Sequence, residues 1–572
     1  MIRRLRSVCV MTAVSDAATA SPAKGKIKAF TGRTLSRLLH LPPQTSDYTV
    51  HHRVRVPMRD GVELLADHYE PTTATPVGTL LVRCPYGRGF PFSTIFGTVY
   101  ASRGYHVVFQ SVRGTFGSGG VFDPMVNEIA DGADTVEWLR HQPWFTGSFA
   151  TVGLSYLGFT QWALLADPPP EMKAAVITVG PHDVSGPRWG PGSFGLHDFL
   201  GWSALVARQE DRNRLRLLIR QARSRRALAR ATTGLPAGQA GRKLLGDGAT
   251  WWEDWLSHPE ADDPFWAKTN IRDALKHTDI PVLLIGGWQD LFLEQTLAQY
   301  SALKDRGVDV AATIGSWTHT QVMSKGAPTV IRETLEWLDA HLGGRGATRS
   351  PVRIEMNGKG WIDLPEWPPT MPERVLYLQP TGRLGDAAPP DTAGPTRFTY
   401  NPVDPTPTIG GRLLSPEAGY RRDAKLAERP DVLCFTGDRL PADLYVVGTP
   451  FIELSHSCDN PYHDLFVRIS EVDSKNVSRN VSDGYRRSPT VSKGTGTIRI
   501  DLDSVAHRFR AGSRIRVMIA GGSHPRFARN LGTSEPLVSG RELMVSTHTI
   551  HLGEGGVSRL VLPAGSQPPS GH

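Results

Sequence analysis

Three residues whose types act together in acyl-transfer chemistry follow one another along the chain. Ser155 lies in "GLSYLG", which differs from the nucleophile motif G-x-S-x-G only because its second glycine comes one position late. Asp290 follows in "VLLIGGWQD", and His319 in "VAATIGSWTHT". A serine hydroxyl is a weak nucleophile until an imidazole takes its proton, and a carboxylate keeps that imidazole in the required tautomer. The order serine, aspartate, histidine therefore predicts a catalytic triad.

Each of the three residues comes just after a run that is typical of a buried strand. Ser155 also precedes a segment of helical period, and a sharp strand-to-helix turn exposes a serine Oγ. The free N–H groups of the new helix then face developing negative charge. Taken alone, Asp290 also suits a helix N-cap and His319 a loop position. The coincidence of all three at strand ends favours the triad.

The oxyanion of an acyl-transfer reaction needs two hydrogen-bond donors. One is the backbone N–H of the residue after the nucleophile, Tyr156. The other is expected from the loop after an earlier strand, and "LLVRCPYGRG" offers the phenol of Tyr86. The alternative for Tyr86 is an aromatic packing role after Pro85.

The elements that must position these residues alternate between strand and helix. After a predicted β-hairpin at 48–71, the strand-like runs cover 78–86, 105–114, 149–156 and 173–180, and the helical segments cover 128–142 and 158–167. The alternation resumes through 280–304 and 308–319, and a helix at 329–342 closes it. Strands that alternate with helices predict a doubly wound, mostly parallel sheet.

Two regions depart from this alternation. Residues 182–275 hold no convincing strand and predict a helical insertion. After about residue 350, short alternating strands follow one another without helices, which predicts an all-β sandwich of jelly-roll type. Its strands are expected at 374–380, 445–457, 464–473, 496–503 and 513–522. The predicted division is a disordered tail (1–45), a first core part (46–181), the helical insertion (182–276), a second core part (277–346) and the β-domain (347–572).

Composition narrows the class of protein. A chain of 572 residues exceeds what one hydrophobic core organises, so several domains are expected. The net charge of +8 is concentrated in residues 208–231, where a solvated Arg-rich helix is favoured over a nucleic-acid or membrane patch. No apolar run is long enough to span a bilayer. We therefore expect neither a nucleic-acid partner nor a membrane span.

The cysteines and the N-terminus bear on the compartment. Cys9, Cys84, Cys434 and Cys458 form no CxxC pair, which indicates neither a zinc site nor a disulfide framework and fits a reducing compartment. The N-terminus imitates a signal peptide, but polar residues interrupt its short apolar run. We expect a cytoplasmic protein, with export as the alternative.

Five motifs in order resemble those of the cocaine-esterase-type (CocE/NonD) hydrolases, relatives of the X-prolyl dipeptidyl peptidases. They are "RCPYGRG", "QSVRGTFGSGGVF", "GLSYLGFTQW", "GGWQDLF" and "GSWTHT", and the resemblance spans about residues 48–560. It implies an α/β-hydrolase core, a helical cap and a C-terminal jelly roll. It also implies Ser155 as nucleophile, Asp290 as acid, His319 as base, and Tyr86 with the Tyr156 amide as oxyanion hole.

The resemblance implies a metal-free, cofactor-free serine hydrolase that forms an acyl-enzyme on a small ester or amide substrate. Side chains within the motifs are candidates for the substrate pocket: Trp162, Trp288, Gln289 and Trp317. Gln289 stands where the family commonly has an aromatic residue, and Ser316 where it often has proline, so the pocket is expected to differ.

Alternatives to a simple esterase stay open at this point. An X-prolyl dipeptidyl peptidase or α-amino-acid ester hydrolase would need carboxylates that bind an amine, and "WWEDW" and "PEADDPFW" are candidates. A glycan-binding protein with a vestigial triad is the alternative from another class. A homo-oligomer is compatible with all of them.

Overall fold

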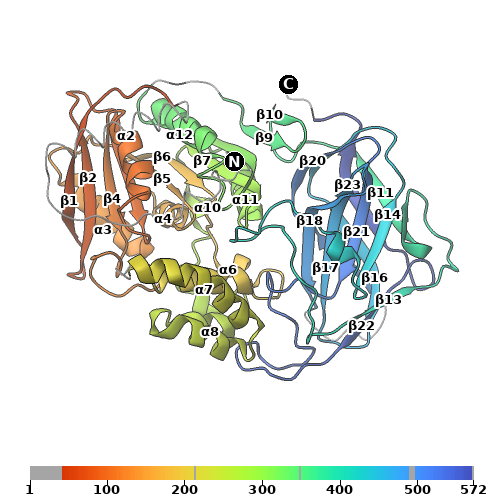
Figure 1. Ribbon diagram of the computed structural model, residues 1–572. Coiled ribbons are helices and arrows are strands. Elements are labelled where there is room, and N and C mark those ends of the chain that lie inside the picture. Colours follow the sequence, from red (N-terminus) through yellow and green to blue (C-terminus); the bar gives the residue numbers. More distant parts are fainter. Residues whose placement is uncertain (1–40, 211–213, 345, 347–348, 489–495, 570–572) are drawn as a thin grey trace.

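The computed structural model describes residues 41–210, 214–344, 346, 349–488 and 496–569. The chain forms an α/β body and a β-rich body that lie side by side (Figure 1). Most of the predicted N-terminal tail, residues 1–40, lies outside the described residues, so the predictions of disorder and of a cytoplasmic location stay predictions. No helix in the described part of the chain is long and apolar enough to cross a membrane.

Six parallel strands form the centre of the first body, as the alternation predicts. In spatial order they are β4 (Tyr105–Ser111), β3 (Gly78–Cys84), β5 (Phe149–Leu154), β6 (Met172–Thr178), β7 (Val282–Gln289) and β8 (Val310–Thr318). Nearly all of their residues are buried, which is usual for parallel strands covered on both faces. Their carboxyl ends meet at one edge of the sheet.

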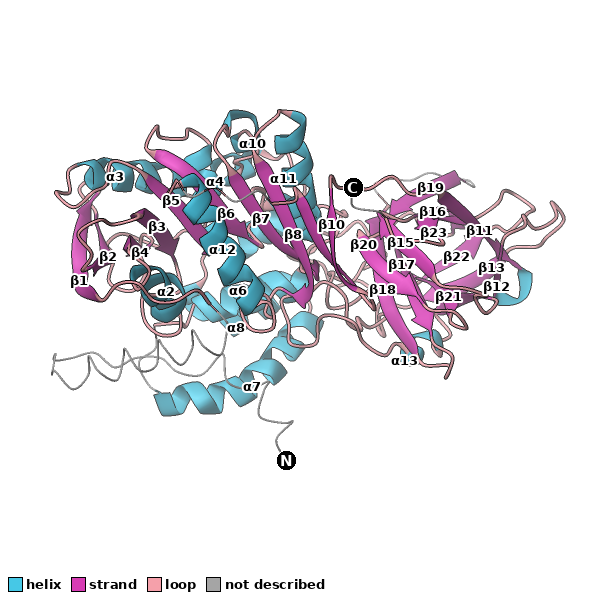
Figure 2. Cartoon of the chain, turned by 90° about the horizontal axis from the view of Figure 1, so that it is seen from above, coloured by secondary structure: helices cyan, strands magenta, loops and turns pink. Residues whose placement is uncertain are grey.

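Helices cover both faces of this sheet (Figure 2). One layer contains α3 (Glu128–Arg140), α4 (Tyr156–Leu165), α10 (Ala274–His277) and α11 (Leu293–Asp305). The other contains η2 (Ser93–Thr98), α2 (Val99–Ala101) and α12 (Ala327–His341). Each layer closes its own hydrophobic cluster against the sheet, so the strands that carry the candidate residues are held rigidly.

An antiparallel pair of strands lies at each edge of the sheet. The predicted hairpin is present as β1 (Tyr48–Pro57) and β2 (Glu63–Pro71), and β2 pairs with β4. At the other edge lie β9 (Val352–Met356) and β10 (Gly360–Leu364), with β9 parallel to β8. The sequence-based division at residue 346 assigned these two strands to the β-domain. They instead extend the core sheet. The alternating burial of β9 suits a strand of either body, so the sequence pattern did not distinguish the two.

A helical segment separates β6 from β7, and no strand occurs in the described part of 182–275. It comprises α5 (Ser185–Trp189), α6 (Leu196–Val206), α7 (Arg214–Thr233), α8 (Ala237–Leu245), η3 (Gly246–Gly248), α9 (Trp252–Ser257) and η4 (Pro264–Thr269). The part of the Arg-rich stretch from Arg214 onward is helical, in α7, whereas residues 211–213 lie outside the described residues. The segment has its own aromatic-rich cluster, which packs along the carboxyl edge of the sheet.

The C-terminal body is built from short strands around a large apolar cluster and a smaller second one. They are β11 (Glu373–Gln379), β12 (Arg383–Gly385), β13 (Thr396–Tyr400), β14 (Val432–Gly437), β15 (Leu444–Gly448), β16 (Phe451–Cys458), β17 (Asp464–Val472), β18 (Ser478–Arg487), β19 (Gly496–Asp501), β20 (Val505–Phe509), β21 (Arg514–Ala520), β22 (Ser546–Ile550) and β23 (Arg559–Gly565). Two one-turn helices, η5 (Pro380–Gly382) and α13 (Ala424–Ala427), interrupt them. The single strand expected at 445–457 is two strands, because Pro450 lacks an N–H and breaks the ladder.

A partly buried network of ion pairs joins the two bodies. Arg412 of the β-domain contacts Glu294 of α11 (Nη1–Oε1 3.3 Å) and also pairs with Asp503. Arg526 continues the network to Asp483, with an Nη1–Oδ2 distance of 3.1 Å. Burial raises the pKa of Asp503 to about 6 despite its two arginine neighbours. Removing one member of such a network leaves an uncompensated buried charge.

Replacement of Arg412 therefore tests this junction. We expect Arg412→Met to lower the free energy of unfolding by about 3–5 kcal/mol, measured by urea denaturation. The matched control is Arg383→Met, whose partner Asp438 is 81% exposed. It should change the free energy of unfolding by less than about 1 kcal/mol. Equal effects of the two substitutions would contradict a stabilising network.

Buried histidines link stability to pH. Burial lowers the pKa of His68 and of His456 from 6.5 to about 3, and that of His182 and of His524 to about 4. The unfolded chain therefore binds more protons than the folded chain between about pH 6.5 and pH 4. Stability is present above this window and is lost as the pH falls through it.

We expect the free energy of unfolding to fall steadily as the pH is lowered through this window, by up to about 1.4 kcal/mol per pH unit for each histidine. The variant His524→Leu should show a shallower slope by one such increment in urea titrations. A slope that is identical in the two proteins would exclude His524 as one of the responsible groups.

Candidate active site

Ser155 occupies a strained turn between β5 and α4. Its backbone has φ 57° and ψ −121°, a conformation that a non-glycine residue adopts at a cost of about 1–3 kcal/mol. The two nearby glycines make the turn possible. A Cβ on Gly153 would lie 2.5 Å from Cβ of Leu157, and a Cβ on Gly158 would lie 2.5 Å from Cα of Gly180. The late glycine thus lets the first turn of α4 pack against the chain just after β6.

The structure brings the three candidate triad residues together. His319 follows β8, and its Nε2 lies 3.0 Å from Oγ of Ser155. Its Nδ1 lies 2.6 Å from Oδ1 of Asp290, which follows β7. Asp290 is completely buried, and its Oδ2 accepts a hydrogen bond from the Phe292 amide at 3.0 Å. The carboxylate therefore contacts the imidazole and also closes the turn that leads into α11. It is not the N-cap of that helix, because Phe292 occupies the N-cap position.

Tyr86 stands beside the serine, in the loop after β3. Its phenol oxygen accepts a hydrogen bond from Trp202 Nε1 at 3.0 Å and lies next to the Ser155 hydroxyl. Burial raises the pKa of Tyr86 above its ordinary value, so the phenol keeps its proton. Because an indole N–H is only a donor, it occupies an oxygen lone pair and leaves the phenol hydrogen free to donate.

Tyr156 begins α4, and its side chain points away from Ser155 into a buried polar cluster. Its hydroxyl donates to Oε1 of Glu128 at 2.8 Å and accepts from the Met125 amide at 2.7 Å. Glu128 in turn pairs with Arg83 at 2.9 Å, and both side chains are at least 96% buried. Burial raises the pKa of Glu128. This cluster holds the residue whose backbone N–H is the expected second oxyanion donor.

The predicted pocket residues do not gather at the serine. Trp162, Trp288 and Trp317 are buried in the hydrophobic clusters of the core. The indole of Trp288 donates to the carbonyl of Glu355, and that of Trp317 to the carbonyl of Gly286. The described contacts of these three tryptophans are packing contacts of the core and do not support their prediction as pocket-lining residues. Gln289 is buried, with its amide beside the Tyr420 phenol.

Sequence reasoning missed an aromatic cluster beside the nucleophile. Trp202 stacks on Tyr156 with ring centroids 6.3 Å apart, and Trp255 stacks on Trp202 at 6.0 Å. Phe122 packs against Tyr156 and edge-on against Trp251. Three of these rings come from the helical segment. The tryptophans of "WWEDW" were the sequence signal for this cluster, but the sequence interpretation used only the carboxylates of that motif.

Sequence reasoning also missed the loop of the β-domain that backs the site. A Cβ on Gly419 would lie 3.1 Å from Cγ2 of Thr318, the neighbour of His319. The next residue, Tyr420, is beside Gln289, the neighbour of Asp290. Although burial opposes it, Asp503, Glu294 and more weakly Asp290 hold the pKa of Arg412 above its usual value. The C-terminal body therefore contacts the residues flanking both triad partners of the serine.

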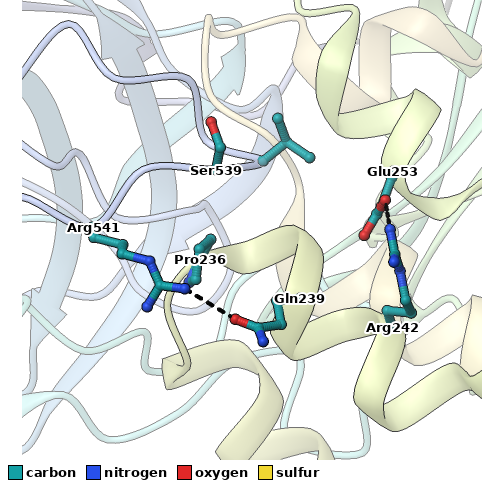
Figure 3. A pocket seen from close by; sticks show the side chains of 7 residues that line it. Pro236, Gln239, Arg242, Glu253, Ser539 and Arg541 are labelled. Atoms are coloured by element: carbon teal, nitrogen blue, oxygen red, sulfur yellow. Dashed lines mark hydrogen bonds and ion pairs between the residues drawn. The ribbon is translucent and has the colours of Figure 1, made fainter.

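Two acidic residues of the segments proposed for amine binding are engaged in other contacts. Glu253 pairs with Arg242 at the rim of a surface hollow of about 470 Å³, which Pro236, Gln239 and Arg541 also line (Figure 3). Asp263 accepts from the Phe265 amide at 2.8 Å as the cap of η4. Among the described residues no group of three His, Cys, Asp or Glu side chains has an arrangement that holds a metal ion.

Comparisons with known proteins agree with this architecture. Residues 60–321 match the model of the X-Pro dipeptidyl-peptidase (S15) family, and residues 346–561 match the X-Pro dipeptidyl-peptidase C-terminal non-catalytic domain. The chain is 30% identical to cocaine esterase of Rhodococcus sp., over 90% of this chain and 99% of that one. A putative serine esterase of Mycobacterium tuberculosis is 24% identical over 85% of this chain and 93% of its own.

Solved structures share the fold. An aminopeptidase from a Thaumarchaeota archaeon superposes with a TM-score of 0.79 at 23% identity, covering 92% of this chain and 98% of its own. An α-amino acid ester hydrolase gives 0.77 at 21% identity with the same coverage. A CocE/NonD family hydrolase from Staphylococcus aureus gives 0.66 at 17% identity, covering 91% and 94%. The resemblance seen in the five motifs is confirmed: the chain belongs to the cocaine-esterase-like (CocE/NonD) family of serine hydrolases, related to the X-prolyl dipeptidyl peptidases.

Proposed function

We propose that this protein hydrolyses a small ester, with amides as possible further substrates, through a Ser155–His319–Asp290 triad and an acyl-enzyme intermediate. The observation that supports this most directly is the continuous chain of hydrogen-bond distances, 2.6 Å and 3.0 Å, that joins Asp290 to His319 and His319 to Ser155. The serine in this hydrogen-bonded series is held in a strained turn at the carboxyl edge of the sheet.

Acylation begins when Ser155 Oγ attacks the substrate carbonyl carbon. His319 Nε2 takes the hydroxyl proton, and Asp290 stabilises the imidazolium through the bond to Nδ1. The carbonyl oxygen becomes an oxyanion, which the Tyr156 amide and the Tyr86 hydroxyl stabilise. The imidazolium then protonates the leaving alcohol, the ester bond breaks, and an acyl group remains on Ser155.

Deacylation repeats these steps with water. His319 Nε2 removes a proton from the water, whose oxygen attacks the acyl carbon. The second tetrahedral intermediate collapses when the same proton returns to Ser155 Oγ, which releases the acid. This chain's residues supply all of these proton transfers.

The surrounding parts have supporting roles in this proposal. The helical segment acts as a cap whose aromatic rings form the acyl side of the site, as the stacking of Trp202 on Tyr156 suggests. The C-terminal body, which we interpret as a jelly roll, backs Asp290 and His319. An X-prolyl dipeptidyl peptidase or α-amino-acid ester hydrolase remains the alternative within the family, although Glu253 and Asp263 are engaged in other contacts.

The nucleophile is tested by covalent labelling. A fluorophosphonate probe should label the wild-type protein and fail to label Ser155→Ala, because the probe reacts only with the activated hydroxyl. Intact mass after labelling gives the stoichiometry. The control is Ser185→Ala, which removes a buried serine that bonds to Asp183 instead of a histidine. Labelling that persists in Ser155→Ala would refute the assignment.

The oxyanion donor is tested by removing one oxygen atom. Tyr86→Phe should lower kcat by about 10²–10³-fold with little change in KM, because the lost bond forms in the transition state. Tyr100→Phe removes another buried phenol, on the opposite face of the sheet, and should leave kcat unchanged. If Tyr86→Phe raised KM alone, Tyr86 would bind substrate and not stabilise the oxyanion.

A further inference from the structure

Arg188 of α5 is a buried cation surrounded by aromatic rings. The residue is only 1% exposed, and its guanidinium carbon is 3.7 Å from the ring centroid of Trp255. The rings of Trp266 and Phe199 lie at 5.0 Å and 5.2 Å. Cation–π contacts of this kind compensate only part of the hydration energy that the guanidinium loses on burial.

The guanidinium has few polar partners. Nη1 donates to the Val184 carbonyl at a long 3.3 Å, Nη2 reaches only the thioether of Met125 at 4.0 Å, and Nε has no hydrogen-bond partner. No carboxylate in the described part of the chain forms an ion pair with it, since the nearby Asp183 is bound by Arg272 at 2.7 Å. Burial lowers the pKa of Arg188 to about 9.

Three other arginines with mostly buried side chains have carboxylate partners. Arg83 pairs with Glu128, Arg412 with Asp503, and Arg468 with Asp483. Arg103, another buried arginine, donates to the carbonyls of Val99 and Pro42 at 2.6 Å. Arg188 differs from these arginines, because no carboxylate in the described part of the chain pairs with it and its one carbonyl contact is long. Leaving such a group unpaired is costly, which makes a ligand carboxylate a natural partner.

The surroundings of Arg188 are continuous with the proposed acyl side of the site. Trp255, which covers the guanidinium, stacks on Trp202, and Trp202 stacks on Tyr156 and donates to Tyr86. Met125 forms a second link, because its amide donates to the Tyr156 hydroxyl while its sulfur contacts Arg188. Met125 also has a positive φ of 72°, a strained conformation of the kind found at ligand sites.

We propose that Arg188 determines acyl specificity: it binds a carboxylate at the far end of the acyl chain, in the place that Met125 Sδ now holds. The inference rests on the proposed function and names its substrate class, half-esters of dicarboxylic acids. A guanidinium binds a carboxylate through two parallel hydrogen bonds. The flexible methionine can move aside, and the aromatic walls suit the methylene chain between the two ends. A cationic acyl group is disfavoured at the same place.

Matched esters of equal chain length test the proposal. The p-nitrophenyl half-ester of adipate is compared with p-nitrophenyl hexanoate and with its trimethylammonio analogue. The wild-type kcat/KM should be highest for the adipate half-ester and lowest for the cationic ester. Arg188→Met should lower kcat/KM for the adipate half-ester by about tenfold to a hundredfold and change that for hexanoate by less than about threefold.

Control variants separate recognition from packing. Arg242→Met removes a surface arginine of the same helical segment, paired with Glu253 (Figure 3), and should leave all three ratios unchanged. Arg188→Lys keeps the charge without the bidentate geometry and should fall between wild type and Arg188→Met; it carries the test if the methionine variant does not fold. Equal losses on the adipate and hexanoate esters, or a wild-type preference for hexanoate, would overturn the proposal.

A binding measurement distinguishes failure of this inference from failure of the proposed function. Monomethyl adipate is titrated calorimetrically into Ser155→Ala and into Ser155→Ala/Arg188→Met. Binding that is lost in the double variant supports the subsite without any turnover, whereas binding that survives overturns it. If Ser155→Ala retains full esterase activity, the triad assignment fails while this binding result still decides on Arg188.

Discussion

The strand-to-helix turn at Ser155 is the constraint on which the candidate site depends. A serine with φ 57° is held there because Gly153 clears Leu157 and Gly158 clears Gly180. The strain is offset by the packing of α4 against the sheet, where every residue of the helix is buried. The same turn aims Oγ toward His319 and leaves the Tyr156 amide free at the start of the helix.

The parts that meet at this turn come from all regions of the described chain. The core sheet supplies Ser155, Asp290 and His319 at the ends of β5, β7 and β8. The helical segment adds Trp202, which orients the Tyr86 phenol by occupying its oxygen. The β-domain contributes the loop around Gly419 and Tyr420 behind the acid and the base. The ion pairs of Arg412 then fix the β-domain against α11, so the position of that loop depends on the core.

The order of Ser155, Asp290 and His319 and their positions after strands were readable from the sequence, because parallel strands bring their carboxyl ends to one edge. The alternating pattern likewise predicted the central sheet. The pocket prediction for the tryptophans of the motifs is not supported by their contacts, since a motif says which residue turns outward but not where its neighbours point. Residues Arg412, Tyr420 and Trp202 lie far from the triad in sequence. Only tertiary contacts show that these residues belong to the site. The sequence pattern of β9 and β10 likewise did not show which of the two bodies they join.

The central claim is that a histidine-activated Ser155 carries the acyl group during turnover. It is tested most directly by rapid acid quenching of the wild-type protein with an activated ester, followed by intact-mass and peptide-level mass spectrometry. The account predicts one acyl mass increment, located on Ser155, that forms before steady-state turnover and does not form in His319→Ala. Turnover without a covalent adduct, or an adduct on another residue, would contradict it.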